Sequence, residues 1–374
     1  MNSYAQKWFD TYSLKPNTPF VQKEFWLYFP LEKWQRQGYL KPEEAVVNYE
    51  EYLNGIFGLE PSGIHALGGL GWCESAFYPM FEEKMVEDRG EQEVVQDAAG
   101  RHVLCFKNRR TGFMPTYLKH PVRDEKSWEE NCLWRLDPDT PERIANNELE
   151  ANEAAARQRD DLMISQRMIG GYMFLRSLAG PEEIMYLFYD NPGLVHKCMR
   201  QWLELADAVC ARHQKQVEFD EVFLAEDICY NHGPLISPEM IQEFLFPYYQ
   251  QLISSIRSRQ KRHLYVQIDT DGFSDPIIEL YQKAINMESL SPFEVASGCD
   301  VVRTGRQYPQ LIIQGGIDKR ILTGDKEMIK RYLDGILPVM YARGGYIPTF
   351  DHAVPEEAEF ENYLYYRQQC LEYS

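Results

Sequence analysis

From Leu162 to the C-terminus the sequence alternates short apolar runs with longer amphipathic segments, and this alternation constrains the fold most strongly. Turn and capping residues separate the two kinds of segment. Asn191-Pro192 and Ser237-Pro238-Glu239 each open a predicted helix, and Pro247 should bend the second one. Strands that alternate with helices are typical of βα units in a parallel sheet. The predicted strands include EVFLAEDI, HLYVQID, NMESLS, LIIQGGID and GYIPTF.

The number of these units favours a closed (β/α)8 TIM barrel with eight parallel strands. A chain of 374 residues has the length for this fold, because such barrels run from about 250 to over 400 residues. A doubly wound open sheet is the alternative. No GxGxxG or GxxxxGK[ST] motif opens a helix in this sequence, however, so we expect no nucleotide cofactor.

Two segments depart from the alternation. Residues 1–60 are predicted to form an amphipathic, helical N-terminal extension. Within the barrel region, residues 61–374, the stretch 84–107 contains three β-like runs separated by glycine turns, which predicts a small antiparallel β excursion. The expected organisation is therefore an α/β chain that forms one domain overall.

Charge and composition exclude several classes of partner. The chain has 39 Lys and Arg against 57 Asp and Glu, a net charge of −18, which argues against nucleic acid and against an anionic membrane surface. No stretch approaches the roughly 18 consecutive apolar residues of a membrane span. The N-terminus lacks the apolar core of a signal peptide, and the eight cysteines are scattered without CxxC spacing. We expect a cytoplasmic protein that acts on a small molecule.

Polar side chains, most of them acidic, recur where the predicted strands end. In a (β/α)8 barrel these positions converge on the active site, so the residues are candidates for catalysis or binding. Any single acid can instead cap a helix or stabilise a turn. The turn role fits Asp318 best, because Lys319 and Arg320 follow it.

We predict catalytic roles for the strand-end residues that the turn role explains least and for a histidine after the last strand, whose side chain is suited to proton transfer. These residues are Glu226, Asp227, Asp271 and His352. Loop aromatics and further polar residues near the same ends are predicted to bind the substrate. This second group is Trp72, Phe77, Tyr78, His232, Glu294 and Asp351.

Four stretches of the sequence resemble the uroporphyrinogen decarboxylase (URO-D) superfamily. EDICYNHGPLISPEMIQEFLFPYYQQLI is similar to the segment in which an acid-bearing strand leads through a Ser-Pro-Glu cap into a helix with a Pro-Tyr pair. DTDGFSDPIIELYQKAINMESLSPFEVASGCDVV, IIQGGIDKRIL and GGYIPTFDHAVPEEAEFENY resemble the later units. The resemblance covers residues 160–370 and implies a TIM barrel.

The resemblance is closer to the corrinoid-dependent methyltransferases of the superfamily than to the true decarboxylases. Those decarboxylases carry a PMRQAGR-like motif near the N-terminus, where this chain reads EFWLYFPLEKWQRQGY. In the thiol-methylating enzymes a His-x-Cys pair and a later Cys hold zinc. The positions that look equivalent here are Asp269, Asp271 and His352, which implies zinc held by two carboxylates and a histidine.

The resemblance therefore implies an enzyme that moves a methyl group between a small O- or N-methyl substrate and a corrinoid carried by a partner protein. Two alternatives stay open. One is a decarboxylase or lyase that acts on a small carboxylic acid with aspartate and histidine as acid and base. The other is a barrel without catalytic activity that serves as a binding module.

Overall fold

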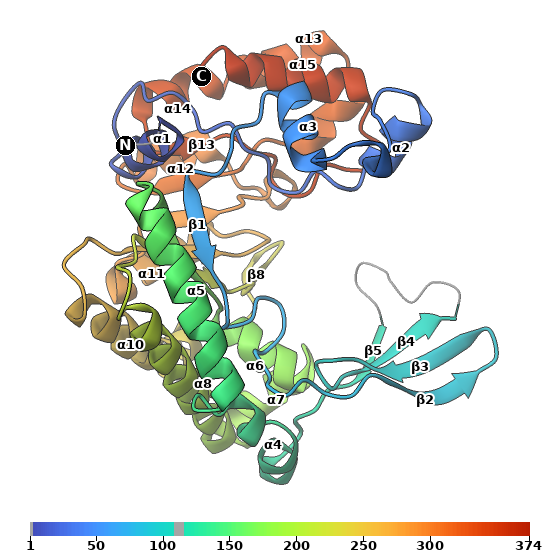
Figure 1. The fold of residues 1–374 in the computed structure, drawn as a ribbon, viewed down its shortest axis with the longest axis vertical. Coiled ribbons are helices and arrows are strands. Elements are labelled where there is room, and N and C mark those ends of the chain that lie inside the picture. The colour runs from blue at the N-terminus through green and yellow to red at the C-terminus, as the bar shows by residue number, and fades with distance from the viewer. Residues whose placement is uncertain (1–2, 108–115) are drawn as a thin grey trace.

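The computed structural model describes residues 3–107 and 116–374. Its centre is a parallel sheet of seven strands in the order β1-β6-β7-β10-β11-β12-β13, surrounded by helices (Figure 1). This arrangement confirms the predicted barrel fold and all five named strands. The expected count of eight is not met, since seven strands pair within the described residues. They are β1 (Ile64–Leu67), β6 (Met163–Ile169), β7 (Glu221–Ala225), β10 (Tyr265–Asp269), β11 (Ser289–Ser291), β12 (Ile312–Gln314) and β13 (Tyr346–Ile347).

A non-helical stretch, residues 20–27, lies at the seam between the two end strands, β13 and β1. Val21 in this stretch packs in one apolar cluster with residues of both end strands. Gln22 accepts a hydrogen bond from the backbone N–H of Glu60, which precedes β1, at 2.8 Å. Trp26 accepts one from the N–H of Val354, which follows β13, at 2.9 Å. The N-terminal extension is thus irregular in part rather than helical throughout.

Helices cover the outside of the sheet and make up most of the remaining chain (Figure 1). No helix among the described residues combines the length and apolarity needed to cross a bilayer. The N-terminal helices are α1 (Ser3–Tyr12), α2 (Leu31–Arg36) and α3 (Tyr49–Phe57). The later ones are α4 (Glu125–Asn131), α5 (Pro141–Arg159), α6 (Gly171–Ala179), α7 (Glu183–Asp190), α8 (Pro192–His213), α9 (Pro238–Phe244), α10 (Phe246–Ser258), α11 (Asp275–Ile285), α12 (Val301–Gln307), α13 (Lys326–Asp334), α14 (Leu337–Arg343) and α15 (Phe360–Leu371).

The predicted helix starts are confirmed by their capping bonds. The Asn191 side chain accepts a hydrogen bond from the backbone N–H of Leu194 at the start of α8. Ser237 caps α9 in the same way. The expected bend at Pro247 is a full break between α9 and α10, because proline cannot donate the backbone hydrogen bond that would continue the helix.

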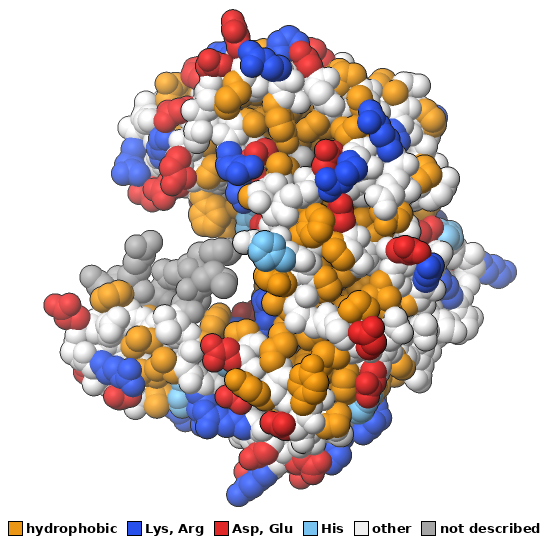
Figure 2. Space-filling model, turned by 180° about the vertical axis from the view of Figure 1, so that it is seen from behind, with side chains coloured by type: hydrophobic (Ala, Val, Ile, Leu, Met, Phe, Trp, Pro, Cys, Tyr) orange, Lys and Arg blue, Asp and Glu red, His pale blue; other side chains and the backbone are white. Residues whose placement is uncertain are grey.

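The antiparallel excursion forms a separate sheet, which we call the arm. It contains β2 (Lys84–Arg89), β3 (Gln92–Gln96), β4 (His102–Phe106) and β5 (Thr116–Lys119), paired in that order. The three predicted runs are confirmed, and β5 adds a fourth strand. The arm projects from the barrel (Figure 1), and Figure 2 shows a hollow between it and the rest of the molecule.

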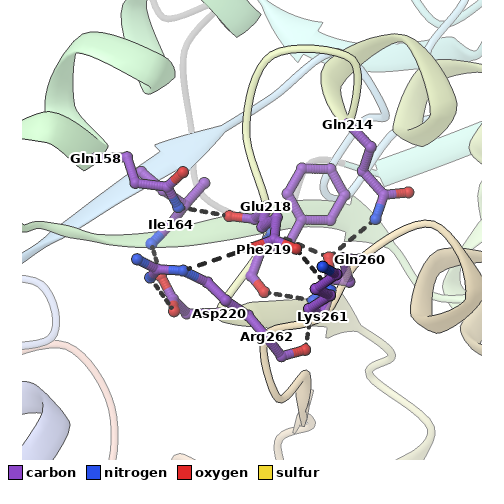
Figure 3. A network of polar contacts seen from close by, with 9 residues as sticks. All are labelled: Gln158, Ile164, Gln214, Glu218, Phe219, Asp220, Gln260, Lys261 and Arg262. Carbon is purple, nitrogen blue, oxygen red and sulfur yellow. Dashed lines mark hydrogen bonds and ion pairs between the residues drawn. The ribbon is translucent and has the colours of Figure 1, made fainter.

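A polar network ties together the loops that enter the barrel strands (Figure 3). Asp220, just before β7, accepts a hydrogen bond from the backbone N–H of Ile164 in β6 and forms an ion pair with Arg262, both at 2.8 Å. Gln260 bonds both backbone groups of Phe219. These contacts lie at the amino ends of the strands, where barrels build stability rather than catalysis.

Candidate active site

A polar network fills the interior of the barrel. Gln314 donates a hydrogen bond to Gln267 at 2.8 Å, and Gln267 donates one to Ser291 at 3.0 Å. Ser291 in turn donates to the carboxyl group of Asp269 at 2.5 Å. Tyr12 of α1 enters from the amino end of the barrel and donates its hydroxyl to Glu221. The barrel core is therefore hydrophilic and can surround a polar ligand.

A cavity of about 680 Å³ opens beside this network. Its wall combines strand residues with the seam stretch 20–27 and α3. Trp72 lines it and stacks on Phe223 with ring centroids 4.9 Å apart. Two cationic side chains, Arg167 of β6 and Lys23, also line it. The volume and mixed lining suit a small-molecule ligand.

Four carboxyl groups and a histidine gather at the carboxyl ends of the strands, and we call them the acid cluster. The partial burial of Asp271 and the neighbouring charges of Asp227, Glu294 and Asp269 raise its pKa to about 8. The closest contact joins the Oδ2 of Asp271 to the Nε2 of His352 at 3.6 Å. The cluster therefore holds a proton on Asp271 at neutral pH.

Asp269 connects the acid cluster to the cavity. It ends β10 and lines the cavity wall. Burial raises its pKa to about 6, and the charge of Asp227 acts in the same direction. Asp227 itself adopts a φ of 43° and forms an ion pair with Arg176 at 2.5 Å. A non-glycine residue in this left-handed region is uncommon, although aspartate tolerates it better than most.

His352 lies against two aromatic residues of the seam stretch. Its ring centroid is 5.2 Å from that of Trp26 and 5.7 Å from that of Phe25. Burial lowers the pKa of His352, and the nearby Lys319 charge lowers it further. The imidazole is thus neutral near pH 7, which leaves it able to accept a proton from the neighbouring Asp271.

Glu226 lies apart from the acid cluster. Its side chain is fully buried behind the sheet, where it accepts hydrogen bonds from Tyr249 at 2.5 Å and Tyr281 at 3.0 Å. Burial raises its pKa to about 7. The carboxyl group lies near the backbone of Gly171, at the start of α6. The structure thus places the predicted catalytic residue Glu226 among helices, outside the residues that line the cavity.

Two other predicted site residues hold the loops in place. Asp351 is buried and accepts hydrogen bonds from the backbone N–H groups of Val295 at 3.0 Å and Lys319 at 3.2 Å. Glu294 accepts one from the N–H of Gly272 at 2.9 Å. These bonds connect the loops that follow neighbouring strands and so position the acid cluster.

The remaining predicted binding residues lie outside the cavity wall, with the exception of Trp72. Phe77 is buried and packs edge-on against Phe81, with ring centroids 5.3 Å apart. Tyr78 donates its backbone N–H to the carbonyl of Arg135. His232 is exposed in the loop after β7. The structure therefore does not bring Phe77, Tyr78 or His232 into contact with the cavity.

The sequence interpretation missed the polar residues of the strand interiors, above all Arg167. A signal for them exists in the two-residue period of a strand. Gln267 and Asp269 alternate with apolar residues in β10, and β6 carries Ser165 and Arg167 at the same two-residue spacing with the polar Gln166 between them. Polar residues at alternate positions of otherwise buried strands indicate a hydrophilic barrel interior.

The residues as placed do not fit the zinc site that the resemblance implied. Among the described residues, no three His, Cys, Asp or Glu side chains gather in an arrangement that could hold a metal ion. Asp271 and His352 approach each other, but the carboxyl group of Asp269 is bonded to Ser291. Catalytic zinc takes three protein ligands at about 2 Å.

Comparison with known proteins identifies relatives of this chain. A family model described as uroporphyrinogen decarboxylase (URO-D) matches residues 162–372, more than half of the sequence. A methyltransferase from Methanosarcina mazei is structurally similar over 99% of this chain and 98% of its own, at 14% identity and a TM-score of 0.56. A B12-independent methionine synthase from Shewanella sp. W3-18-1 matches over 95% and 92%, at 10% identity and a TM-score of 0.39. No curated protein matches the sequence.

Proposed function

Because this chain belongs to the uroporphyrinogen decarboxylase family, we propose that it is a methyltransferase that moves a methyl group between a small O- or N-methyl substrate and a corrinoid carried by a partner protein. The observation that carries the proposal is a carboxyl group with a raised pKa close to the cavity wall. Asp271 has a pKa of about 8; it does not itself line the cavity but follows Asp269 of the wall by two residues. Demethylation of an ether or amine needs such a proton donor.

The proton balances the departure of the methyl group. When the bond from carbon to oxygen or nitrogen breaks, its electron pair stays on the leaving atom, which then takes a proton from Asp271. A reduced corrinoid would supply the electron pair that accepts the methyl group. Asp271 is left as a carboxylate, and its half-exposed side chain takes up a proton from solvent, with the neutral His352 3.6 Å away.

Space for both partners supports the proposal. The cavity of about 680 Å³ suits a small substrate. A protein-borne corrinoid is bulky and needs an open approach to the ends of the barrel strands. The hollow between the arm and the body of the molecule offers such an approach (Figure 2).

The test mixes the protein with a reduced corrinoid protein and a panel of methoxylated and N-methylated compounds, and follows the absorbance of the corrinoid. Asp271→Asn should lower the rate by about 100-fold or more, the usual scale of general-acid catalysis. Its thermal midpoint should stay close to that of the wild type. A large loss of stability with the rate retained would instead assign Asp271 a structural role.

Asp318→Asn is the matched control, because this aspartate also follows a barrel strand. Its carboxylate forms an ion pair with Arg320 at 2.8 Å and caps a short helical turn. Neither aspartate lines the cavity, but the pKa of Asp271 is raised whereas that of Asp318 is lowered. The control variant should keep the wild-type rate.

A decarboxylase acting on a small carboxylic acid is the second candidate. The cations Arg167 and Lys23 on the cavity wall favour it, because they suit a carboxylate substrate. Release of carbon dioxide from a small acid, with no spectral change of the corrinoid across the panel, would support this reaction over methyl transfer.

A further inference from the structure

Arg167 is an arginine in the middle of a barrel strand, and its side chain makes no hydrogen bond to any other residue that the structure describes. It lines the cavity, and its Nε is buried without an acceptor in the part of the chain that the structure describes. A buried donor left unsatisfied costs about 1–3 kcal/mol, and more when it is charged. A ligand that accepts its hydrogen bonds would remove this cost.

Lys23 brings a second cation to the same cavity. Burial and, to a lesser extent, the charge of Arg167 lower its pKa to about 8. The Nζ of Lys23 reaches the side-chain oxygen of Gln314 at 3.4 Å. Within residues 3–107 and 116–374, neither Lys23 nor Arg167 lies within ion-pair distance of a carboxylate. The two cations thus repel each other without a compensating anion in direct contact.

The carboxyl groups deep in the cavity are engaged by other donors. Glu221 accepts hydrogen bonds from Tyr12 and, at 2.6 Å, from Ser165. Asp269 accepts one from Ser291 at 2.5 Å. These bonds keep the two carboxyl groups away from the guanidinium group of Arg167. Its N–H donors therefore stay available to a ligand in the cavity.

Aromatic rings hold the guanidinium group in position. The Cζ of Arg167 lies 5.3 Å from the ring centroid of Phe223 and 5.9 Å from that of Trp72. Contacts of this kind stabilise a cation over an aromatic face and limit its motion. A fixed guanidinium presents its paired N–H groups in the geometry that a carboxylate matches.

We propose that Arg167 and Lys23 form a carboxylate-binding subsite, so that the substrate is a small organic acid that also carries the O- or N-methyl group. The inference rests on the proposed function, which supplies the methyl group. With the carboxylate held by Arg167, the other end of the substrate lies toward Asp269 and the acid cluster. The cavity thereby fixes the orientation of the substrate between Arg167 and the acid cluster.

Binding of benzoate, measured by calorimetry on the full chain, tests the subsite without any reaction. Benzamide is the neutral control of the same shape. Arg167→Gln should weaken benzoate binding by about tenfold or more, equivalent to about 1.4 kcal/mol, and should leave any benzamide binding unchanged. Arg167→Lys keeps the charge and should bind benzoate with intermediate affinity. Arg331→Gln, a change at an exposed arginine of α13, should bind as the wild type does.

A second readout uses the wild type alone, in case the Arg167 variants fail to fold. Benzoate should protect Lys23 from acetylation by acetic anhydride, as measured by mass spectrometry, and benzamide should not. Equal binding of benzoate and benzamide, or the absence of saturable benzoate binding, overturns the subsite. Benzoate binding without methyl transfer from any methylated acid keeps the subsite and rejects the proposed function. Demethylation of neutral ethers without benzoate binding keeps the proposed function and rejects the subsite.

Discussion

Asp269 holds its carboxyl group in the barrel interior, where burial raises its pKa to about 6. The unfolded chain has a pKa near 3.9 for this group, so folding favours the protonated form. Its contribution to stability is complete below about pH 4 and is lost as the pH rises through 6. The thermal midpoint of the wild type, relative to that of Asp269→Asn, should therefore fall between pH 4 and 6 and then level off.

Asp318→Asn provides a control of opposite sign. Partial burial acts to raise the pKa of Asp318, but hydrogen bonds and the charge of Arg320 outweigh it and lower the pKa. The stability that Asp318 contributes is therefore present above about pH 4 and lost at lower pH. If the thermal midpoints of the wild type and Asp269→Asn differ by the same amount across the pH range, Asp269 has the same pKa in the folded chain as in water.

The face of the strand on which a residue lies explains which candidates meet in the site. Phe223 of β7 lines the cavity and Leu224 on the opposite face does not, while Glu226, which follows the strand, is bonded to tyrosines of two outer helices. The sequence shows that acids end the strands, but residue type alone does not show which face each one occupies. Asp269 could be predicted for the interior because it follows Gln267 at the two-residue period.

At the scale of the element, α15 fastens the seam stretch 20–27 to the barrel through Arg367. This side chain is fully buried. It donates to the carbonyl of Phe57 at 3.1 Å and to the side chain of Gln22 at 2.8 Å, and it lies near the charge of Glu24. Arg367→Met should lower the free energy of unfolding by about 1–3 kcal/mol, because it leaves the carbonyl of Phe57 and the side chain of Gln22 without their donor.

Urea titration followed by far-ultraviolet circular dichroism measures this loss. Arg331→Gln, at an exposed position of α13, should change the free energy by no more than about 0.5 kcal/mol. If Arg367→Met unfolds at the same urea concentration as the wild type, Arg367 does not hold the seam stretch 20–27 to the barrel.

Local signals explain why the barrel elements could be predicted and the seam stretch could not. The cap at Ser237 and the break at Pro247 depend on hydrogen bonds within a few residues, which the sequence displays directly. The non-helical form of residues 20–27 depends on bonds to Glu60 and Val354. Hydrogen-bonding partners so distant in the chain override the local preference for helix, and no pattern in residues 1–60 predicts them.

At the scale of the whole molecule, the N-terminal helix closes the amino end of the barrel. Trp8 and Tyr12 of α1 pack in one cluster with Ile64, Met163 and Ile347, which come from strands at both ends of the sheet. Closure of the sheet therefore combines β-pairing with insertion of the N-terminal residues. A prediction from the strand count alone gives eight strands, because it does not include N-terminal residues that pack between the end strands of the sheet.

Tyr12→Phe tests whether the polar end of this insertion stabilises the fold. The Tyr12 hydroxyl donates to Glu221 and accepts a hydrogen bond from Gln314 at 3.1 Å. Its loss leaves a buried carboxylate with a missing donor, so we expect the free energy of unfolding to fall by about 1–3 kcal/mol. Hydrogen exchange should also rise in β7 and β12, whose side chains lose the shared partner. Tyr186→Phe, at a tyrosine that is 64% exposed, should change neither quantity, and equal behaviour of the two variants would mean that α1 closes the barrel through apolar packing alone.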